Sequence, residues 1–239
     1  MVEMMLDVDL SKLSVLFIGA GAVASRKLSH FDQMPREIHI VAETFSKECA
    51  LALTELIGYV SGDALKLAEF ETFFQNEGVH IFDVRGDRNR LTLDRRRFRD
   101  DDIDKSDVIF CCTNNSILNE KIATAAIPKG KLVNNSSDSN YSSFRNVAVK
   151  QYENFAVGVS GRVAVPVLTK WICDLATRSL SMEHDQFMGI CAKVRNDIKL
   201  EGKQVRDGGW TSVIASRALE FIIADEENLA VSEIKQCLL

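Results

Sequence analysis

Residues 15–27, V-L-F-I-G-A-G-A-V-A-S-R-K, decide the fold that this chain of 239 residues is expected to adopt. Residues 15–18 are a short, continuous apolar run, which is typical of a strand that is buried on both faces of a sheet. A glycine-rich turn follows at residues 19–21, and the apolar spacing from Ala24 to Phe31 predicts a helix. Strand, turn and helix in this order predict the opening of a β-α-β unit.

Further strands and helices alternate along the chain. Residues 38–42 form a second apolar run, about 24 residues after the first, which is too far for a hairpin and suits a right-handed parallel crossover. Residues 108–112 and 132–134 predict two more buried strands, with an amphipathic stretch at 118–126 between them. This alternation predicts an α/β fold with a Rossmann-type parallel sheet, in which ligands bind at the carboxyl ends of the strands.

The composition limits the classes of function. Lys and Arg number 29 and Asp and Glu number 34, so the net charge of −5 excludes a nucleic-acid binder that works through overall positive charge. The first ten residues carry no basic region like that of a signal peptide. No uncharged apolar run reaches the length of about 18 residues that a membrane helix needs. We therefore expect a cytoplasmic protein with reduced core cysteines and with neither a membrane nor a nucleic-acid partner.

Residues 19–24 fit the dinucleotide-binding pattern G-x-G-x-x-A. Gly19 permits a tight turn, Gly21 lets the backbone approach a pyrophosphate, and the small Ala24 lets helix and strand pack closely. Glu43 lies 22 residues beyond Gly21, where a carboxylate accepts a hydrogen bond from a ribose 2′-hydroxyl. Since no Arg or Lys adjoins Glu43 in the sequence, the pattern favours NAD over NADP. A glycine turn without a dinucleotide is the alternative.

The middle of the chain has a weaker pattern. Residues 47–76 read as helical and residues 79–82 as a short strand. Seven arginines follow between residues 85 and 99, and three aspartates come directly after them. We interpret this arginine tract as a solvated charged loop or hairpin, and the alternative is a basic lip for a polyanionic substrate.

The last third of the chain changes character. Residues 155–160 read as a strand, and Pro166 stands where a helix begins, because its missing N–H does no harm there. Val167, Trp171 and Leu175 share one face of that helix. The remaining residues are helical by pattern, with a break at residues 208–209.

Several segments, in order along nearly the whole chain, resemble motifs of the precorrin-2 dehydrogenase family, which includes the N-terminal half of siroheme synthase. Residues 19–27 resemble its G-G-G-x-V-A-x-R-K motif, and residues 113–119 resemble A-T-D-D-x-x-L-N. Residues 133–144 resemble V-N-x-x-D-D-x-x-x-x-x-F, and residues 157–168 resemble V-A-V-S-S-G-G-x-S-P-V-L. Residues 209–210 resemble part of the family's C-terminal helical domain.

This resemblance implies NAD-dependent dehydrogenation of precorrin-2 to sirohydrochlorin in siroheme biosynthesis, which some members combine with metal insertion. It also implies a homodimer of three-part chains. We accordingly expect a Rossmann domain over residues 1–146, enlarged at 46–107. A dimerisation region over 147–178 and a helical domain over 179–239 would follow.

The resemblance also assigns site residues by position. The expected substrate-binding residues are Ser160 and Arg162, and the expected catalytic residue is Asp138. The matched position of the family's aspartate holds Ser137, one residue earlier, and Gly161 replaces a serine. Two alternatives stay open: a catalytically silent protein that binds NAD or a tetrapyrrole, and a protein with chelatase activity alone. The sequence does not identify metal ligands. The expected cofactor-binding residues are Gly19, Gly21, Ala22, Val23, Glu43, Thr44, Thr113 and Asn134.

Overall fold

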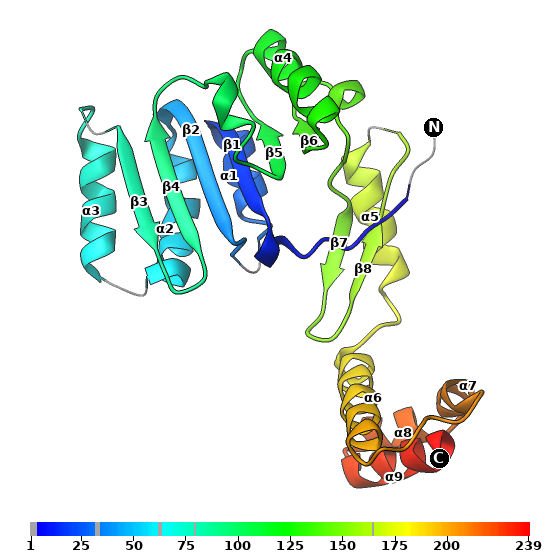
Figure 1. Ribbon diagram of the computed structural model, residues 1–239. Coiled ribbons are helices and arrows are strands. Elements are labelled where there is room, and N and C mark those ends of the chain that lie inside the picture. The colour runs from blue at the N-terminus through cyan, green and yellow to red at the C-terminus, as the bar shows by residue number, and fades with distance from the viewer. Residues whose placement is uncertain (1–3, 32–33, 62–63, 79, 164) are drawn as a thin grey trace. The chain divides into compact units, whose positions relative to one another are not determined.

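A computed structural model describes the chain except for residues 1–3, 32–33, 62–63, 79 and 164 (Figure 1). The chain divides into two compact units, Met1–Arg145 and Asn146–Leu239. The three-part layout, with a further division at residue 178, stays a prediction.

The first unit is built on a six-stranded sheet with the order β3-β4-β2-β1-β5-β6 (Figure 1). All neighbouring strands are parallel except β3, which runs antiparallel to β4 along one edge. Without β3 the order is that of a Rossmann sheet, so the predicted fold class is confirmed. The strands are β1 (Ser14–Ala20), β2 (Glu37–Phe45), β3 (Ile81–Arg85), β4 (Arg90–Arg95), β5 (Val108–Cys111) and β6 (Leu132–Asn135).

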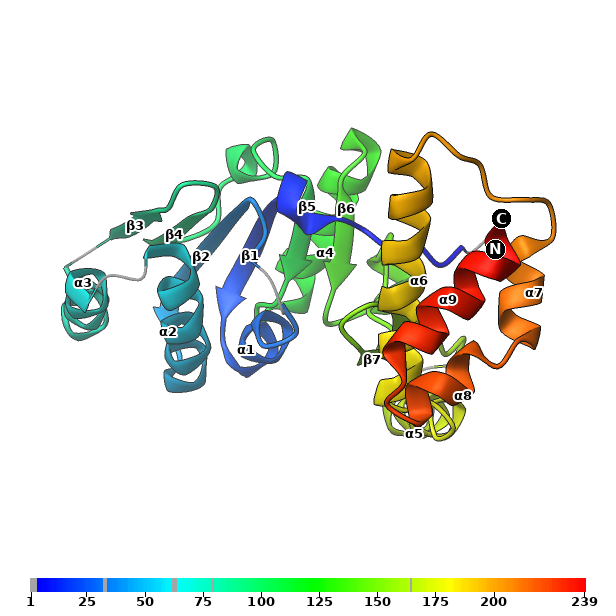
Figure 2. The same ribbon diagram turned by 90° about the horizontal axis from the view of Figure 1, so that it is seen from below.

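Helices cover both faces of this sheet (Figure 2). Their bounds, with those of the short 3-10 helices η1 to η4, are η1 (Leu10–Lys12), α1 (Ala22–Leu28), α2 (Lys47–Ser61), α3 (Ala64–Gln75), η2 (Asp100–Asp102), α4 (Ser116–Ala126), η3 (Ile127–Lys129) and η4 (Ser139–Tyr141). Phe17 of β1 packs in the cluster with α1, α2 and α3, whereas Leu16 and Ile18 pack in the cluster with α4. Alternate side chains of β1 therefore pack into two different cores, one on each face of the sheet. This is why residues 15–18 are all apolar.

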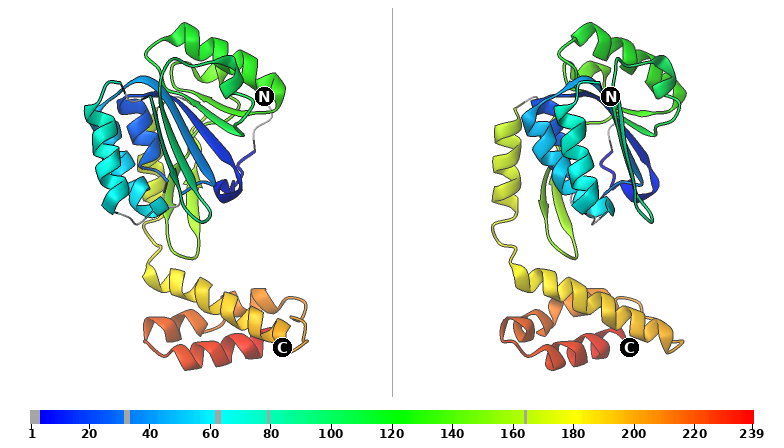
Figure 3. Two further views of the ribbon diagram at one scale, coloured as in Figure 1. Left: turned by 60° about the vertical axis from the view of Figure 1, so that its left-hand side comes forward. Right: turned by 90° about the vertical axis from the view of Figure 1, so that its left-hand side faces the viewer.

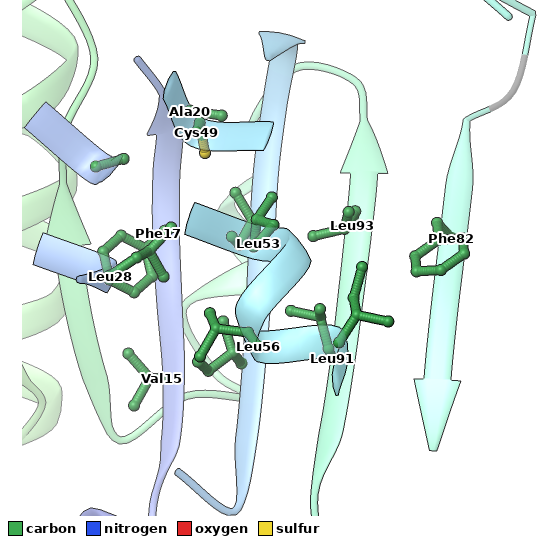
Figure 4. Close-up of a cluster of buried hydrophobic side chains, with 14 of the residues drawn as sticks. Val15, Phe17, Ala20, Leu28, Cys49, Leu53, Leu56, Phe82, Leu91 and Leu93 are labelled. Atoms are coloured by element: carbon green, nitrogen blue, oxygen red, sulfur yellow. The ribbon is translucent and has the colours of Figure 1, made fainter. Parts of the chain in front are cut away.

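The larger core lies under α2 (Figure 4). Leu53 of α2 is fully buried, as are Leu91 and Leu93 of β4. Their alternation with Thr92 is the period-two pattern of a strand. Truncating a buried leucine of this kind to alanine costs about 2 to 5 kcal/mol.

The segment between β2 and β5 is the part of the chain that we expected to be enlarged. Its helical stretch forms α2 and α3, and the strand expected at 79–82 is β3, which begins at Ile81; Val79 lies outside the described residues. The arginine tract lies on the β3–β4 hairpin and the loop after it, so its interpretation as a charged hairpin or loop is confirmed. What the sequence pattern missed is that β4 continues the parallel sheet beside β2.

The second unit combines a two-stranded antiparallel sheet with five helices among its described residues (Figure 3). Helix α5 packs along both strands, while α6 to α9 share a separate apolar cluster. Gly208 has φ +73° at the start of α7, which accounts for the predicted break in the helical pattern. The elements are β7 (Ala148–Gln151), β8 (Ala156–Val159), α5 (Pro166–Ala176), α6 (Met182–Leu200), α7 (Gly209–Ala215), α8 (Ala218–Ile223) and α9 (Glu227–Leu238).

Two chain-wide expectations concern thiols and membrane spans. Five of the six cysteines are buried and all six are free thiols, as expected for core cysteines. Within the part of the chain that the structure describes, no helix has both the length and the apolar character needed to cross a bilayer.

Candidate dinucleotide site

A cavity of about 920 Å³ opens at the carboxyl ends of β1, β2 and β5 in the first unit. Its size lies within the range of small-molecule sites, roughly 300 to 1,000 Å³. β1 and β5 are neighbours at the point where the strand order reverses, which is where open α/β sheets bind ligands. Five of the residues predicted to bind cofactor line the cavity: Gly19, Gly21, Glu43, Thr44 and Thr113.

The two glycines of the turn have different reasons to be glycine. Gly19 has φ +97°, and a Cβ there would lie 2.7 Å from the backbone oxygen of Cys112. The fold itself therefore requires Gly19. A Cβ on Gly21 would meet no protein atom within 4 Å, so the fold leaves open space beside this residue. That space fits the close approach of a pyrophosphate to the backbone.

Ala22 and Val23 form the first turn of α1, directly after Gly21. Their backbone N–H groups have no acceptor inside the helix, because the first turn of any helix leaves them free. Neither residue is among those that line the cavity. If these two residues bind the cofactor, they do so through their backbone N–H groups, because those are the groups that bind an anion at the start of a helix.

Glu43, at the end of β2, is paired with a cation that the sequence did not reveal. The Nε of Arg97 lies 2.8 Å from Oε1 of Glu43, although 54 residues separate them in the chain. Both side chains are exposed, and both residues line the cavity. The observation that no Arg or Lys adjoins Glu43 holds along the sequence only, and in space it is wrong.

Arg96, next to Arg97, is fixed in a buried ionic network. Its guanidinium donates to both carboxylate oxygens of Asp102 at 2.8 and 2.7 Å and to Asp94 at 2.9 Å. Asp94 also lies 2.9 Å from Nε2 of His39. Burial alone would raise the pKa of Asp102, but the Arg96 guanidinium and the backbone N–H of Arg99 outweigh it and hold that pKa below its usual value. The network fixes the wall of the cavity after β4.

A buried amide joins the ends of β5 and β6. Asn119 of α4 is fully buried, and its Oδ1 accepts a hydrogen bond from the Thr113 hydroxyl at 2.6 Å. Its Nδ2 donates to the Thr113 carbonyl at 2.9 Å and to Oγ of Ser137 at 2.7 Å. Thr113 lines the cavity, so this side chain ties the cavity wall to the loop that carries Ser137.

Asn134 of β6 does not line the cavity. It is buried, accepts a hydrogen bond from Nζ of Lys27 at 2.7 Å and donates to the carbonyl of Phe144 at 3.1 Å. Burial lowers the pKa of Lys27, whose Nζ also lies 5.2 Å from the centre of the Phe110 ring. Asn134 therefore links β6 to Lys27 of α1. Because it does not line the cavity, its predicted role in cofactor binding stays a prediction.

The remaining predicted residues are exposed. Asp138 precedes η4, where its carboxylate accepts a hydrogen bond from the backbone N–H of Asn140 at 2.9 Å. Ser160 and Arg162 lie in the second unit, between β8 and α5. Within the described residues, no group of three or more His, Cys, Asp or Glu side chains is arranged to hold a metal ion.

Sequence reasoning did not place Arg96, Arg97 or Asn119 at the dinucleotide site, although it offered the arginine tract as a basic lip for a polyanionic substrate. A signal for the arginines existed, because Leu91 and Leu93 alternate as in a strand, and residues just after a strand meet the binding edge of the sheet. Asn119 carries no such signal, because a buried amide is recognised only by its partners in space.

Comparisons with known proteins find relatives in sequence and in fold. The chain is similar to the siroheme synthases of Nitrosococcus oceani, at 21% identity over 93% of the chain, and Actinobacillus succinogenes, at 24% over 95%. It spans 41% of the length of each of these relatives. The solved structure of SirC, precorrin-2 dehydrogenase, shares the fold, with a TM-score of 0.59 and 21% identity over 98% of this chain and 96% of that one.

Residues 6–148 match a family model described as "Putative NAD(P)-binding". This range covers more than half of the chain and includes every residue that lines the cavity. The expectation of a nicotinamide dinucleotide cofactor, drawn from the glycine turn and Glu43, is confirmed by this match. The chain belongs to the NAD(P)-binding family that this model defines.

Proposed function

We propose that the protein catalyses NAD-dependent dehydrogenation of precorrin-2 to sirohydrochlorin. The observation that carries this proposal is the extent of the similarity to siroheme synthases, which covers 93% and 95% of the chain and so includes both units. A protein that shared only nucleotide binding would match over the sheet alone. The motifs at residues 157–168 and 209–210 add support, because they resemble the precorrin-2 dehydrogenase family outside the dinucleotide-binding segment.

The reaction removes a hydride and a proton from the substrate, so that the macrocycle gains conjugation. The bound dinucleotide supplies the hydride acceptor at its nicotinamide ring. The protein must then hold the ring and the substrate within reach of each other and accept the proton. Gly19 and Gly21 leave room for the pyrophosphate, and Glu43 offers its carboxylate to the ribose.

Asp138 is our candidate for the proton acceptor. Its exposed carboxylate is open to a substrate, and its own loop is anchored, since Ser137 is hydrogen-bonded to buried Asn119. The Asn119 side chain also holds Thr113 in the cavity wall, so the loop of Asp138 is tied to the dinucleotide site. A base in this loop suits a reaction in which proton and hydride leave together.

Precorrin-2 is a polycarboxylate, and exposed cations are needed to attract it to a protein of net charge −5. Arg162, in the exposed segment between β8 and α5, is our candidate for a carboxylate contact, with the Ser160 hydroxyl beside it. Arg95 of the arginine tract is committed elsewhere, since it donates to the carbonyls of Phe73 and Asn76.

We further propose that the protein works as a homodimer through the second unit. Helix α5 exposes a stripe of large apolar side chains, which would be unusual for a free surface. Val167 is 79% exposed, Trp171 54% and Leu175 43%. A second copy of the same helix face would cover the stripe, as a two-fold interface requires self-complementary surfaces.

A second candidate function is supported by the residue at position 137. Because serine stands there, the main alternative is a protein that binds NAD and the tetrapyrrole without turnover.

Anaerobic incubation with precorrin-2 and NAD separates the enzyme from this alternative, since the proposed enzyme yields sirohydrochlorin and NADH in equal amounts. Asp138→Ala should abolish this, while Asp87→Ala, at an exposed aspartate of the β3–β4 turn, should not. NAD binding without product would favour this alternative, and metal insertion into supplied sirohydrochlorin without NAD consumption would favour a chelatase.

A further inference from the structure

We propose that the cavity binds NADP as well as NAD, and that Arg97 is the residue that admits the 2′-phosphate. The inference rests on the dinucleotide lying in this cavity with its adenosine ribose at Glu43, as in the proposed function. It concerns selectivity between the two dinucleotides, which the family description leaves open.

The backbone brings Arg97 to the ribose end of the cavity. In the parallel pairing of β2 and β4, Ala42 lies opposite Arg95, and the N–H of Arg96 donates to the carbonyl of Ala42 at 3.0 Å. Glu43 is the next residue of β2 after Ala42, and Arg97 lies two residues beyond the end of β4, so the parallel pairing brings the two residues close together. Their side chains then complete the ion pair.

Charge is the basis of selectivity at this position. A lone carboxylate accepts a hydrogen bond from the 2′-hydroxyl of NAD and repels the 2′-phosphate of NADP. Here the Arg97 guanidinium lies 2.8 Å from the Glu43 carboxylate, so the pair has no net charge at this edge. The repulsion that would exclude NADP is largely cancelled.

Arg97 is also free to change partner. Its side chain is 86% exposed and makes one ion pair among the described residues, and an exposed pair of this kind contributes little to stability. Neighbouring Arg96 cannot respond in this way, because two aspartates hold its guanidinium. A phosphate dianion offers Arg97 a stronger, bidentate partner than Glu43 does. Arg97 therefore exchanges Glu43 for the phosphate when NADP binds.

Thr44 and Ser46, which follow Glu43 in the chain, also line the cavity and carry hydroxyl groups. Hydroxyl groups donate hydrogen bonds to phosphate oxygens and to ribose oxygens alike. They suit either dinucleotide and leave the choice to the Arg97–Glu43 pair.

The test is calorimetric titration of the full chain with NAD and with NADP at low salt. We expect the Kd for NADP to lie within about tenfold of that for NAD. Arg97→Ala should weaken NADP binding by about 10- to 100-fold, the range of a hydrogen bond to a charged group, and so should shift the ratio of the two Kd values in favour of NAD. Glu43→Gln should have the opposite effect, with tighter NADP and weaker NAD binding.

Two controls make the outcome specific. Arg217→Ala breaks an exposed Arg–Glu pair of similar geometry in the second unit, 3.0 Å from Glu220, and should leave both Kd values unchanged. Arg97→Lys should retain part of the NADP affinity. The proposal is overturned if wild-type protein binds NAD at least about 100-fold more tightly than NADP, or if Arg97→Ala leaves their ratio unchanged. Failure to bind either dinucleotide would instead contradict the placement of the cofactor in this cavity.

Discussion

Asn119 donates its side-chain amide to Ser137 across 2.7 Å, and the same side chain holds Thr113 through its other atoms. One fully buried side chain of α4 thus joins the ends of β5 and β6. Ser137, which the sequence resemblance matches to the aspartate of precorrin-2 dehydrogenases, is therefore tied to the cavity wall by hydrogen bonds.

Removing this amide should loosen both strand ends. We expect Asn119→Ala to lower the free energy of unfolding by about 1 to 3 kcal/mol, because the carbonyl of half-buried Thr113 and its hydroxyl lose hydrogen bonds to this side chain. NAD affinity should fall as well, since Thr113 lines the cavity. Urea unfolding and NAD titration measure the two effects. Asn140→Ala, at an exposed asparagine of the neighbouring η4, is the control and should change neither. Unchanged stability of Asn119→Ala would contradict the role given to this amide.

The two turn glycines should respond differently to alanine. Gly19→Ala places a Cβ against the Cys112 carbonyl at a positive φ, so we expect a large loss of thermal stability. Gly21→Ala meets open space, and should unfold at nearly the wild-type temperature while NAD affinity drops at least about tenfold. Thermal melts and NAD titration separate these outcomes. Wild-type NAD affinity in folded Gly21→Ala would show that the cofactor does not approach this residue.

Arg96 should matter to stability in a pH-dependent way. Asp102 is 2% exposed, so Arg96→Ala leaves its carboxylate buried and unpaired, at a cost of about 3 to 5 kcal/mol at pH 7. Since Arg96 helps to hold the pKa of Asp102 low in the folded protein, this stabilisation is complete above the unfolded value, about 3.9. It is lost as the pH falls through the lower folded value.

The measurement is urea unfolding of wild type and Arg96→Ala between pH 7 and pH 3. Their difference in unfolding free energy should be largest near neutral pH and shrink in acid. Arg88→Ala removes an exposed arginine of the same hairpin and should be nearly neutral throughout. A difference that grows as the pH falls would contradict the assigned ion pair.

The stripe on α5 should determine the oligomeric state. Trp171→Glu introduces a charge into the middle of the apolar face, which is costly if that face is covered by a second copy. Sedimentation should find wild-type dimers and Trp171→Glu monomers with an unchanged circular dichroism spectrum. Trp210→Glu alters a less exposed tryptophan of α7 and should leave the dimer intact. A wild-type monomer at high protein concentration would contradict the proposed interface.

Local sequence signals predicted the parallel sheet because they act over short distances. The apolar run at 15–18, Gly19 and Gly21 determine a buried strand and its turn without help from distant residues. The pairing of Arg97 with Glu43 was beyond such reasoning, because it depends on β4 lying beside β2. The strand pattern of β4 is weak because charged residues, Arg90 and Asp94, flank the alternating Leu91 and Leu93.

The most direct test of the central claim is anaerobic incubation of the protein with precorrin-2 and NAD, followed by absorption spectroscopy. The proposed function predicts the spectrum of sirohydrochlorin together with one NADH for each product molecule, and no product from Asp138→Ala. Protein that binds both NAD and precorrin-2 yet forms neither NADH nor sirohydrochlorin would contradict it.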